Sequence, residues 1–290
     1  MAPEPRVADG IARDEFAARA ERARASLRAC NWCEHRCGAD RTLPAAELAR
    51  TPCGLGVGSS SYKRHVSFAE ELDLVPSYMV YLSGCNLRCR FCVQGPTCFS
   101  PVAGEPVDVE ALARECEAVV ARGAKVINVL GGEPSIHLHT LLELAAAAES
   151  PLPIALNSNM YMTPEVLEAL DGVVAVYVAD LKFGDDECAR RIAGVERYVE
   201  TVRRNLLAAA RQAPVIVRHL LMPGHFDCCF VPTVEWLAAH LPDAAFTLMT
   251  SYVPAWRAAR DGSELGRTTT VDEAERAARL VESLGLKRSE

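Results

Sequence analysis

Short apolar runs alternate with amphipathic stretches along most of the chain, from about residue 78 onward. Apolar runs predict strands at Tyr78–Leu82, Val126–Leu130, Ile154–Leu156, Val173–Val178, Val215–Leu220 and Phe246–Met249. Amphipathic stretches predict helices at Val109–Arg122, His139–Ala148, Pro164–Leu170, Tyr198–Arg211, Pro232–His240 and Val271–Leu284. Because strands separated by helices pair in parallel through right-handed crossovers, we expect an α/β fold, a partial (β/α)6 parallel barrel. Its functional residues should lie at the C-terminal ends of the strands.

The N-terminal part of the chain has a different pattern. Asp14–Ala29 is rich in Ala, Arg and Glu, which predicts a helix. From Cys30 to about Val66 the sequence is rich in Cys, Gly, Ser and Pro and has no clean periodicity, which favours a small segment organised by a metal. We therefore expect an N-terminal helix and Cys-rich metal segment at 1–66, a barrel at 67–256 and a C-terminal helical extension at 257–290.

Composition narrows the classes of function. Half of the 290 residues are hydrophobic, which is enough for a sizeable core. The net charge of −7 and an aromatic content of 6% argue against nucleic-acid binding, which needs basic grooves and stacking platforms. The sequence contains no apolar stretch of about 18 residues, and its start lacks the layout of a signal peptide. We expect a cytoplasmic protein that contacts neither membrane nor nucleic acid.

Seven of the 12 cysteines fall in two tight sets, which favours metal ligation in a reducing compartment over disulfides. Cys85, Cys89 and Cys92 follow the first barrel strand with C-x3-C-x2-C spacing. Three thiolates bind three irons of a 4Fe–4S cluster and leave the fourth open, whereas electron carriers are normally closed by four cysteines. A structural zinc site would need a fourth ligand. The nearest candidate is Cys98, and it is not within a few residues.

Together with the lead-in Tyr81-Leu82-Ser83-Gly84 and the later Gly131-Gly132-Glu133-Pro134, the cysteine run resembles the radical S-adenosylmethionine (SAM) superfamily. The resemblance implies a barrel of radical SAM type in which SAM chelates the open iron. One electron then cleaves SAM to methionine and a 5′-deoxyadenosyl radical, which abstracts hydrogen from a substrate. An electron donor such as flavodoxin or ferredoxin is the expected partner.

The resemblance also implies roles for residues at the strand ends. Gly131, Gly132, Glu133 and Pro134 would meet the methionine amino group, because glycines allow close approach and a carboxylate accepts from an ammonium. Phe91 would touch the adenine. Asn157, Ser158 and Asn159 carry groups suited to ribose hydroxyls, although a plain polar turn fits equally well.

Asp180 and Lys182 after the fourth strand, and Arg218 in the fifth, resemble elements of pyruvate formate-lyase activating enzymes that lie around SAM. An ordinary ion-pair network is the alternative for each of them. Activating enzymes usually carry an Asp where this chain has Asn157, so a cation site of paired acids is not expected there.

Cys30, Cys33, Cys37 and Cys53 supply four thiolates, which make a closed site. Their spacing suits a second, auxiliary 4Fe–4S cluster or structural zinc, and we favour the cluster. The arrangement resembles a broad activating-enzyme-like group of radical SAM proteins that carry such cysteines before the radical motif. His35 is interpreted as a bystander.

Cys228 and Cys229 follow the fifth strand and should lie at the barrel mouth. They could donate hydrogen to a substrate radical, hold substrate or ligate metal, or they could be small buried hydrophobes. The hydrophobe interpretation is preferred for Cys98, Cys116 and Cys188. The residues His219, His225 and Tyr252 could transfer protons or be satisfied polar groups.

Three functions remain open at this stage. The leading one is a radical SAM enzyme that acts on a small biosynthetic substrate, through epimerisation, sulfur insertion or rearrangement. The second is an activase that installs a glycyl radical, or another modification, in a partner protein or peptide. The third is a non-catalytic metal-binding module in which both cysteine sets hold zinc.

Overall fold

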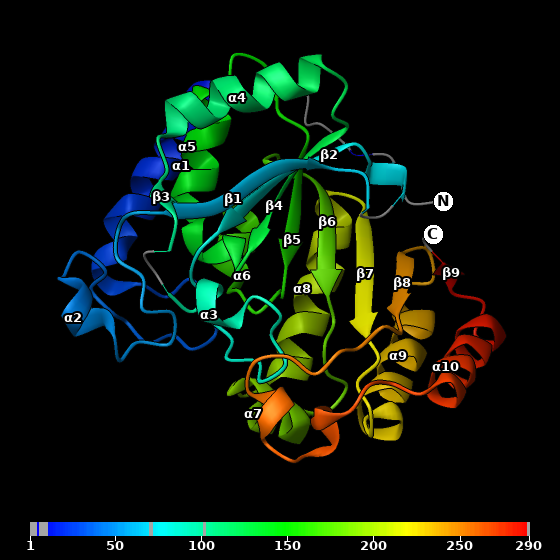
Figure 1. Ribbon diagram of the computed structural model, residues 1–290. Helices are drawn as coiled ribbons and strands as arrows, with labels where there is room; N and C mark the ends of the chain where they lie inside the picture. Colours follow the sequence, from blue (N-terminus) through cyan, green and yellow to red (C-terminus); the bar gives the residue numbers. More distant parts are fainter. Residues whose placement is uncertain (1–4, 6–10, 70–71, 101–102, 289–290) are drawn as a thin grey trace.

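The computed structural model describes Pro5 and residues 11–69, 72–100 and 103–288. Its centre is a nine-stranded open sheet in the order β3-β1-β2-β4-β5-β6-β7-β8-β9 (Figure 1). The six predicted strands are present and mutually parallel, as β2 (Ser77–Leu82), β4 (Val126–Gly131), β5 (Ile154–Ser158), β6 (Val174–Asp180), β7 (Val215–Leu220) and β8 (Ala245–Met249). The α/β class with a parallel, unclosed sheet is therefore confirmed.

Three strands were not predicted. β1 (Ser60–Ser67) pairs antiparallel with β2, and the short β3 (Glu105–Pro106) pairs antiparallel with β1. β9 (Lys287–Arg288) extends the other edge in parallel with β8. β1 has little apolar alternation because most of its side chains are only partly buried or exposed, so its sequence carries no clear strand pattern. The expected boundary between residues 66 and 67 falls within this strand.

The predicted helices are present with ends shifted by a few residues at most. They are α1 (Arg13–Ser26), followed by a 3-10 turn at Leu27–Ala29, α4 (Val109–Ala121), α5 (Leu138–Ala147), α6 (Pro164–Ala169), α8 (Tyr198–Gln212), α9 (Val231–His240) and α10 (Val271–Ser283). The sequence did not predict the short helices α2 (Ala45–Leu48), α3 (Gly95–Cys98) and α7 (Asp186–Ala193). Among the described residues, no helix is long and apolar enough to cross a membrane.

Side chains alternate between the two faces of each strand, and the two faces have separate apolar cores. One face joins the main core with the helices that cover it, whereas the other carries a small cluster of Leu74, Val126, Ala155, Val176, Val178, Ile216 and Ala245. We call this second face the inner face. By alternation, Asn157, Asp180 and Arg218 lie on it, nearer to the strand ends than the apolar cluster. The arrowheads of β6 and β7 point to the edge where α3 and α7 lie (Figure 1).

Candidate active site

The loop that follows β2 carries the first set of cysteines. The backbone N–H groups of Arg88 and Arg90 donate to the carbonyls of Ala193 (2.8 Å) and Ile192 (3.0 Å), so the end of α7 supports the loop. Cys85 and Cys89 are buried and Cys92 is partly exposed. The loop thus presents three thiols at the C-terminal edge of the sheet, where the sequence predicted them.

Burial is the main influence on the thiols of Cys85 and Cys89. It raises the pKa of Cys85, and it raises the pKa of Cys89 to about 12 although the charge of Lys182 opposes it. Thiols in this setting become thiolates when a positively charged metal centre binds them. The donor set of three cysteines on one short loop therefore fits an iron–sulfur cluster.

Cys98 lies closer to this set than the sequence suggested. Its Sγ is 3.6 Å from the Sγ of Cys92, and this contact lowers the pKa of Cys92 to about 7. The cysteine is 1% exposed and lies at the end of α3. The sequence argument against zinc assumed that no fourth thiol lies near the triad. In the structure, the thiol of Cys98 is such a neighbour.

We expect Cys98→Ala to keep the iron and sulfide of the three-cysteine cluster, because Cys85, Cys89 and Cys92 each retain their own sulfur. Iron and acid-labile sulfide per chain, measured after anaerobic reconstitution, check this. Cys92→Ala is the matched control and should lose the cluster. If both variants lose iron equally, Cys98 is a ligand and the site is closed.

The Gly131-Gly132 pair brings the end of β4 against the cysteine loop. The N–H of Gly132 donates to Leu82 O, and the N–H of Glu133 donates to Gly84 O, both at 2.9 Å. A Cβ on Gly132 would lie 1.7 Å from the carbonyl oxygen of Gly84. A Cβ on Gly131, whose φ is +120°, would lie 2.3 Å from the carbonyl oxygen of Leu82. Only glycine fits at these two positions.

Glu133 is fully buried, and its side chain joins the end of β4 to the end of β5. Its carboxylate accepts hydrogen bonds from Ser135 N (3.0 Å), Ser158 Oγ (2.7 Å) and Asn159 N (2.8 Å). Asn159 also donates through Nδ2 to Asn86 Oδ1 in the cysteine loop at 2.8 Å. Two members of the predicted ribose-binding triplet, Ser158 and Asn159, therefore make protein contacts that hold the loop in place.

Asp180, Lys182 and Arg218 form one charged group beside the cysteines. Lys182 Nζ is 2.5 Å from one carboxylate oxygen of Asp180, and Arg218 Nε is 3.3 Å from the other. Burial acts to raise the pKa of Asp180, but the two cations outweigh it and hold this pKa below its ordinary value. Because Lys182 also acts electrostatically on Cys89, the structure brings this group to the cysteine loop.

Several residues around the site were missed by sequence reasoning. The hydroxyl of Tyr62, from β1, is buried without a hydrogen-bond partner among the described residues. Burial raises the pKa of Tyr62, and the nearby thiols of Cys98, Cys92 and Cys85 raise it further. Tyr198 Oη accepts from Lys182 N at 2.8 Å and donates to Asp180 O at 3.1 Å. Tyr62 could have been proposed from the sequence only if β1 had been predicted as a strand beside β2.

Phe91 is buried and packs edge-on against Phe183 and Tyr252. Two of the candidate proton-transfer residues are satisfied polar groups. The ring Nδ1 of His219 lies 2.6 Å from Leu181 O, and Tyr252 Oη donates to Leu265 O at 2.8 Å. The third, His225, lies beside Cys228 and Cys229.

Two of the N-terminal cysteines pack against the segment that directly follows the Gly-Gly-Glu-Pro turn. Cys33 and Cys53 share a buried cluster with Leu55 and Ile136, whereas Cys37 is exposed. Burial raises the pKa of Cys33 to about 12, and the charges of Cys53, Cys30 and Cys37 contribute further, so the four thiols face one region.

Arg41 is buried beside these cysteines, at 1% exposure. It donates to the carbonyls of Ile136 (2.8 Å) and Gly56 (2.9 Å), its Nη1 is 3.9 Å from Cys30 Sγ, and its guanidinium lies over Trp32. Among the residues that the structure describes, it has no carboxylate partner in an ion pair. A buried cation without a carboxylate is costly unless another negative group lies nearby.

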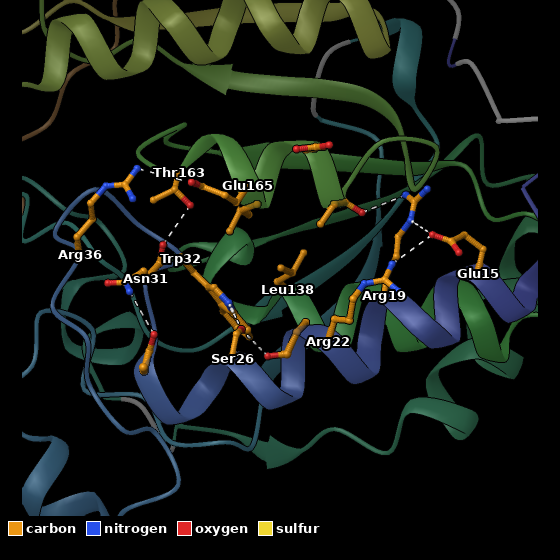
Figure 2. A pocket seen from close by; sticks show the side chains of 15 residues that line it. Glu15, Arg19, Arg22, Ser26, Asn31, Trp32, Arg36, Leu138, Thr163 and Glu165 are labelled. Carbon is orange, nitrogen blue, oxygen red and sulfur yellow. Dashed lines mark hydrogen bonds and ion pairs between the residues drawn. The ribbon is translucent and has the colours of Figure 1, made fainter.

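A groove of about 630 Å³ lies elsewhere, between α1, α6 and the segment around Trp32 (Figure 2). The figure shows Arg19 and Arg22 reaching to Glu15 on one side, and Thr163 bonded to the backbone of Asn31 on the other. None of the predicted site residues lines this groove. This groove is therefore separate from the strand ends that carry the cysteine loop and the charged residues.

The fold is of the α/β class and its cysteine loop is of a metal-binding type, and comparisons with known proteins identify the family. Residues 79–237 match the model of the Radical SAM superfamily. The chain is 32% identical over 264 residues to uncharacterized protein MJ0674 of Methanocaldococcus jannaschii, covering 89% of this chain and 75% of that protein. It is 37% identical over 84 residues to 7-carboxy-7-deazaguanine synthase of Hyperthermus butylicus, covering 29% of this chain and 34% of that enzyme.

Streptococcus suis SuiB has a similar fold, with a TM-score of 0.53 at 15% identity, over 71% of this chain and 44% of SuiB. The chain thus spans less than half the length of these last two proteins. It belongs to the radical SAM superfamily and is an enzyme, and membership implies a 4Fe–4S cluster and SAM. This result rules out the non-catalytic metal-binding module.

Proposed function

We propose that Cys85, Cys89 and Cys92 hold the 4Fe–4S cluster, and that this enzyme uses SAM to act on a small polar biosynthetic molecule. When bound, the cluster and SAM supply reductive cleavage of SAM and abstraction of a hydrogen atom from the substrate. The observation that carries the proposal is that residues from several strands meet at the cysteine loop. Side chains and backbone from β2, β4, β5, β6 and β7 meet at one edge of the sheet, around the cysteine loop.

The residues of the chain divide into two roles. Gly131, Gly132 and Glu133, with Ser158 and Asn159, position the cysteine loop and leave backbone exposed to a ligand at the end of β4. Asp180, Lys182 and Arg218 offer two cations and one carboxylate, which suit the charged and hydroxyl groups of SAM. Phe91 and Pro134 would complete the cofactor site, and Asn157 is the one member of its triplet that is partly exposed on the inner face.

Polar groups on the inner face support a small polar substrate. Both amide atoms of Asn128 and the hydroxyl of Thr247 are buried without hydrogen-bond partners among the described residues. Each such group costs about 1–3 kcal/mol unless something bonds to it. A polar ligand that hydrogen-bonds to these groups on the inner face of the sheet would recover this free energy. The matched stretch of 7-carboxy-7-deazaguanine synthase, an enzyme named for a small heterocyclic product, is consistent with a substrate of this kind.

We further propose that Cys30, Cys33, Cys37 and Cys53 bind a second 4Fe–4S cluster. Four thiolates around a metal centre carry net negative charge, which would compensate the buried guanidinium of Arg41. Zinc remains the alternative ligand of the same four thiolates, and iron per chain distinguishes the two. About eight iron atoms per chain indicate two clusters, whereas about four iron atoms, together with a zinc ion that is lost in Cys30→Ala/Cys33→Ala, indicate the alternative.

The test of function is anaerobic incubation of the reconstituted enzyme with SAM and dithionite, followed by chromatography of 5′-deoxyadenosine. We expect formation of this product and stimulation by pools of small polar metabolites. Absence of the product from protein that contains iron and sulfide would refute the proposed chemistry.

The activase alternative has one structural observation in its favour. Val93 and Val253 are 75% and 61% exposed. They belong to segments that contact one another at the cysteine loop, since Ala258 N donates to Arg90 O at 2.9 Å. Exposed apolar side chains there suit a protein, either the electron donor or a protein substrate. Stimulation of product formation by a partner protein, with isotope transfer from a glycine α-carbon, would favour the activase.

A further inference from the structure

Four metal-binding side chains meet between α7 and the turn that precedes α9. Cys188 belongs to α7, and His225, Cys228 and Cys229 belong to η4 (Phe226–Phe230), one turn of π-helix, and its preceding residue. Among the described residues, this is the one group of three or more Cys, His, Asp or Glu ligand atoms that all lie within 4.8 Å of one another. Neither of the other two cysteine sets is so compact.

Five of the six distances among the four atoms match one tetrahedral ion, and the sixth, from Cys188 Sγ to Cys229 Sγ, is at most 4.8 Å. Cys228 Sγ is 3.7 Å from Cys188 Sγ and 3.9 Å from Cys229 Sγ. His225 Nδ1 is 3.5, 3.3 and 3.8 Å from the sulfurs of Cys188, Cys228 and Cys229. Zinc with Zn–S of about 2.3 Å and Zn–N of about 2.0–2.1 Å places tetrahedral ligands about 3.8 Å apart for two sulfurs, and about 3.6 Å apart for sulfur and nitrogen.

We propose that Cys188, His225, Cys228 and Cys229 bind a single zinc ion in a closed tetrahedral site, separate from the iron–sulfur clusters. Three thiolates and one imidazole in this geometry are typical of zinc. A 4Fe–4S cluster places each thiolate on a different iron, so it needs more widely separated ligands than these four atoms provide. The proposal does not depend on the reaction of the enzyme.

The second contact of His225 orients the ring for this role. Nε2 is 3.0 Å from Glu264 Oε1, and Arg191 Nη1 is 2.8 Å from the same oxygen. Arg191 Nη2 also lies 3.4 Å from Nε2, but the carboxylate of Glu264 is the nearer partner. A carboxylate in an ion pair with Arg191 only accepts, so Nε2 carries the proton and donates to Glu264. The lone pair of Nδ1 then faces the three sulfurs, as in carboxylate–histidine–zinc arrangements.

The surroundings make this a built site and not a chance meeting of thiols. Cys229 is 0%, His225 3% and Cys188 7% exposed, while the partly exposed Cys228 leaves a route from solvent. A Cβ on Gly184 would lie 2.4 Å from the carbonyl oxygen of Cys229, so the loop after β6 fits closely against the π-turn. Single π-turns next to an α-helix, as here before α9, frequently mark functional sites.

A zinc ion here would connect α7, η4 and the segment around Glu264. Figure 1 shows α7 beside the orange segment that precedes α10, at the edge to which the parallel strands point. The last residues of α7 also accept the hydrogen bonds from the cysteine loop. A closed site with four protein ligands is structural in character, and it would hold α7 against the loop that carries the triad.

The experiment is metal analysis of the purified full chain, with zinc and iron measured together and zinc coordination determined by X-ray absorption. We expect about one zinc per chain with three sulfur ligands and one nitrogen ligand. The double variant Cys188→Ala/Cys229→Ala should lose at least about 90% of the zinc and keep its iron, while Cys116→Ala, a control at another buried cysteine, keeps both. The triple variant Cys85→Ala/Cys89→Ala/Cys92→Ala should lose the iron of its own cluster, about half of the total if the N-terminal cluster is present, and keep zinc. This result separates the test from that of the proposed function.

Three results would overturn the proposal. The first is folded wild-type protein that contains no zinc after growth in zinc-supplemented medium. An intact mass lower by two hydrogens would show that two of these cysteines form a disulfide instead. The second is zinc coordinated by four sulfurs. The third is zinc that survives in the double variant but disappears from Cys30→Ala/Cys33→Ala, which would place it at the N-terminal cysteines. Where the double variant fails to fold, the coordination of zinc in the wild-type protein decides the question.

Discussion

Replacing Cys89 by alanine should abolish formation of 5′-deoxyadenosine, by at least about 1,000-fold, because groups that act as a unit lose nearly their whole effect when one is removed. The residue lies at the centre of the triad, is 7% exposed and faces the charge of Lys182. With two thiolates left, the cluster has no stable set of ligands on this loop. Iron, sulfide and the electron paramagnetic resonance signal of the reduced cluster should fall together with the product.

Cys116→Ala is the matched control, since Cys116 is 0% exposed within α4 and belongs to neither cysteine set. It should retain the product and the signal. If Cys89→Ala keeps the cluster signal and forms 5′-deoxyadenosine at the wild-type rate, the triad is not the ligand set and Cys98 becomes the first replacement to consider.

Gly132→Ala is expected to have the second-largest effect. The added Cβ would meet backbone on the opposite side, at 1.7 Å from Gly84 O and 2.5 Å from Gly84 C, where no flexible side chain can move away. The end of β4 and the cysteine loop must therefore separate, which breaks the hydrogen bond from Glu133 N to Gly84 O. We expect a loss of at least about 2 kcal/mol in the free energy of unfolding, in the range of overpacked sites.

The same displacement should weaken SAM binding and cluster assembly, because Cys85 directly follows Gly84. Thermal unfolding gives the stability change, and quenching of the cluster signal by SAM gives binding. Gly58→Ala is the control, since its Cβ would meet nothing within 4 Å and its backbone is in an ordinary conformation. Equal behaviour of the two variants would show that the close approach at Gly132 is unimportant.

Much of the fold follows from local pattern. The strand β7 was predicted at its observed bounds, and the other five parallel strands within a few residues, because buried parallel strands are continuous apolar runs. β1 was missed because its side chains are mostly polar and carry no strand pattern. It lies near the edge of the sheet, and its backbone pairing with β2 and β3 makes it a strand.

The candidate site shows the same division. The sequence placed the cysteine triad, the Gly-Gly-Glu-Pro turn and the charged residues of β6 and β7 at strand ends. Only the packed structure showed that Glu133 holds Ser158 and Asn159, and that Asn157 lies on the inner face. A one-residue step along a strand reverses the face, and the sequence does not state which face is inner.

By itself, the sequence determined the class of this protein, because its cysteine spacing, its turn glycines and its alternation of strands and helices are all encoded within short stretches. Only the tertiary structure determined which residues surround Cys188, which the sequence analysis interpreted as a small buried hydrophobe. The parallel pairing of β6 with β7 brings Cys188 to His225, Cys228 and Cys229, which are 37 to 41 residues later in the chain. Glu264, which contacts His225, is farther away still in the sequence. Ligand sets of this kind depend on which elements lie side by side, and that is settled by packing over the whole chain.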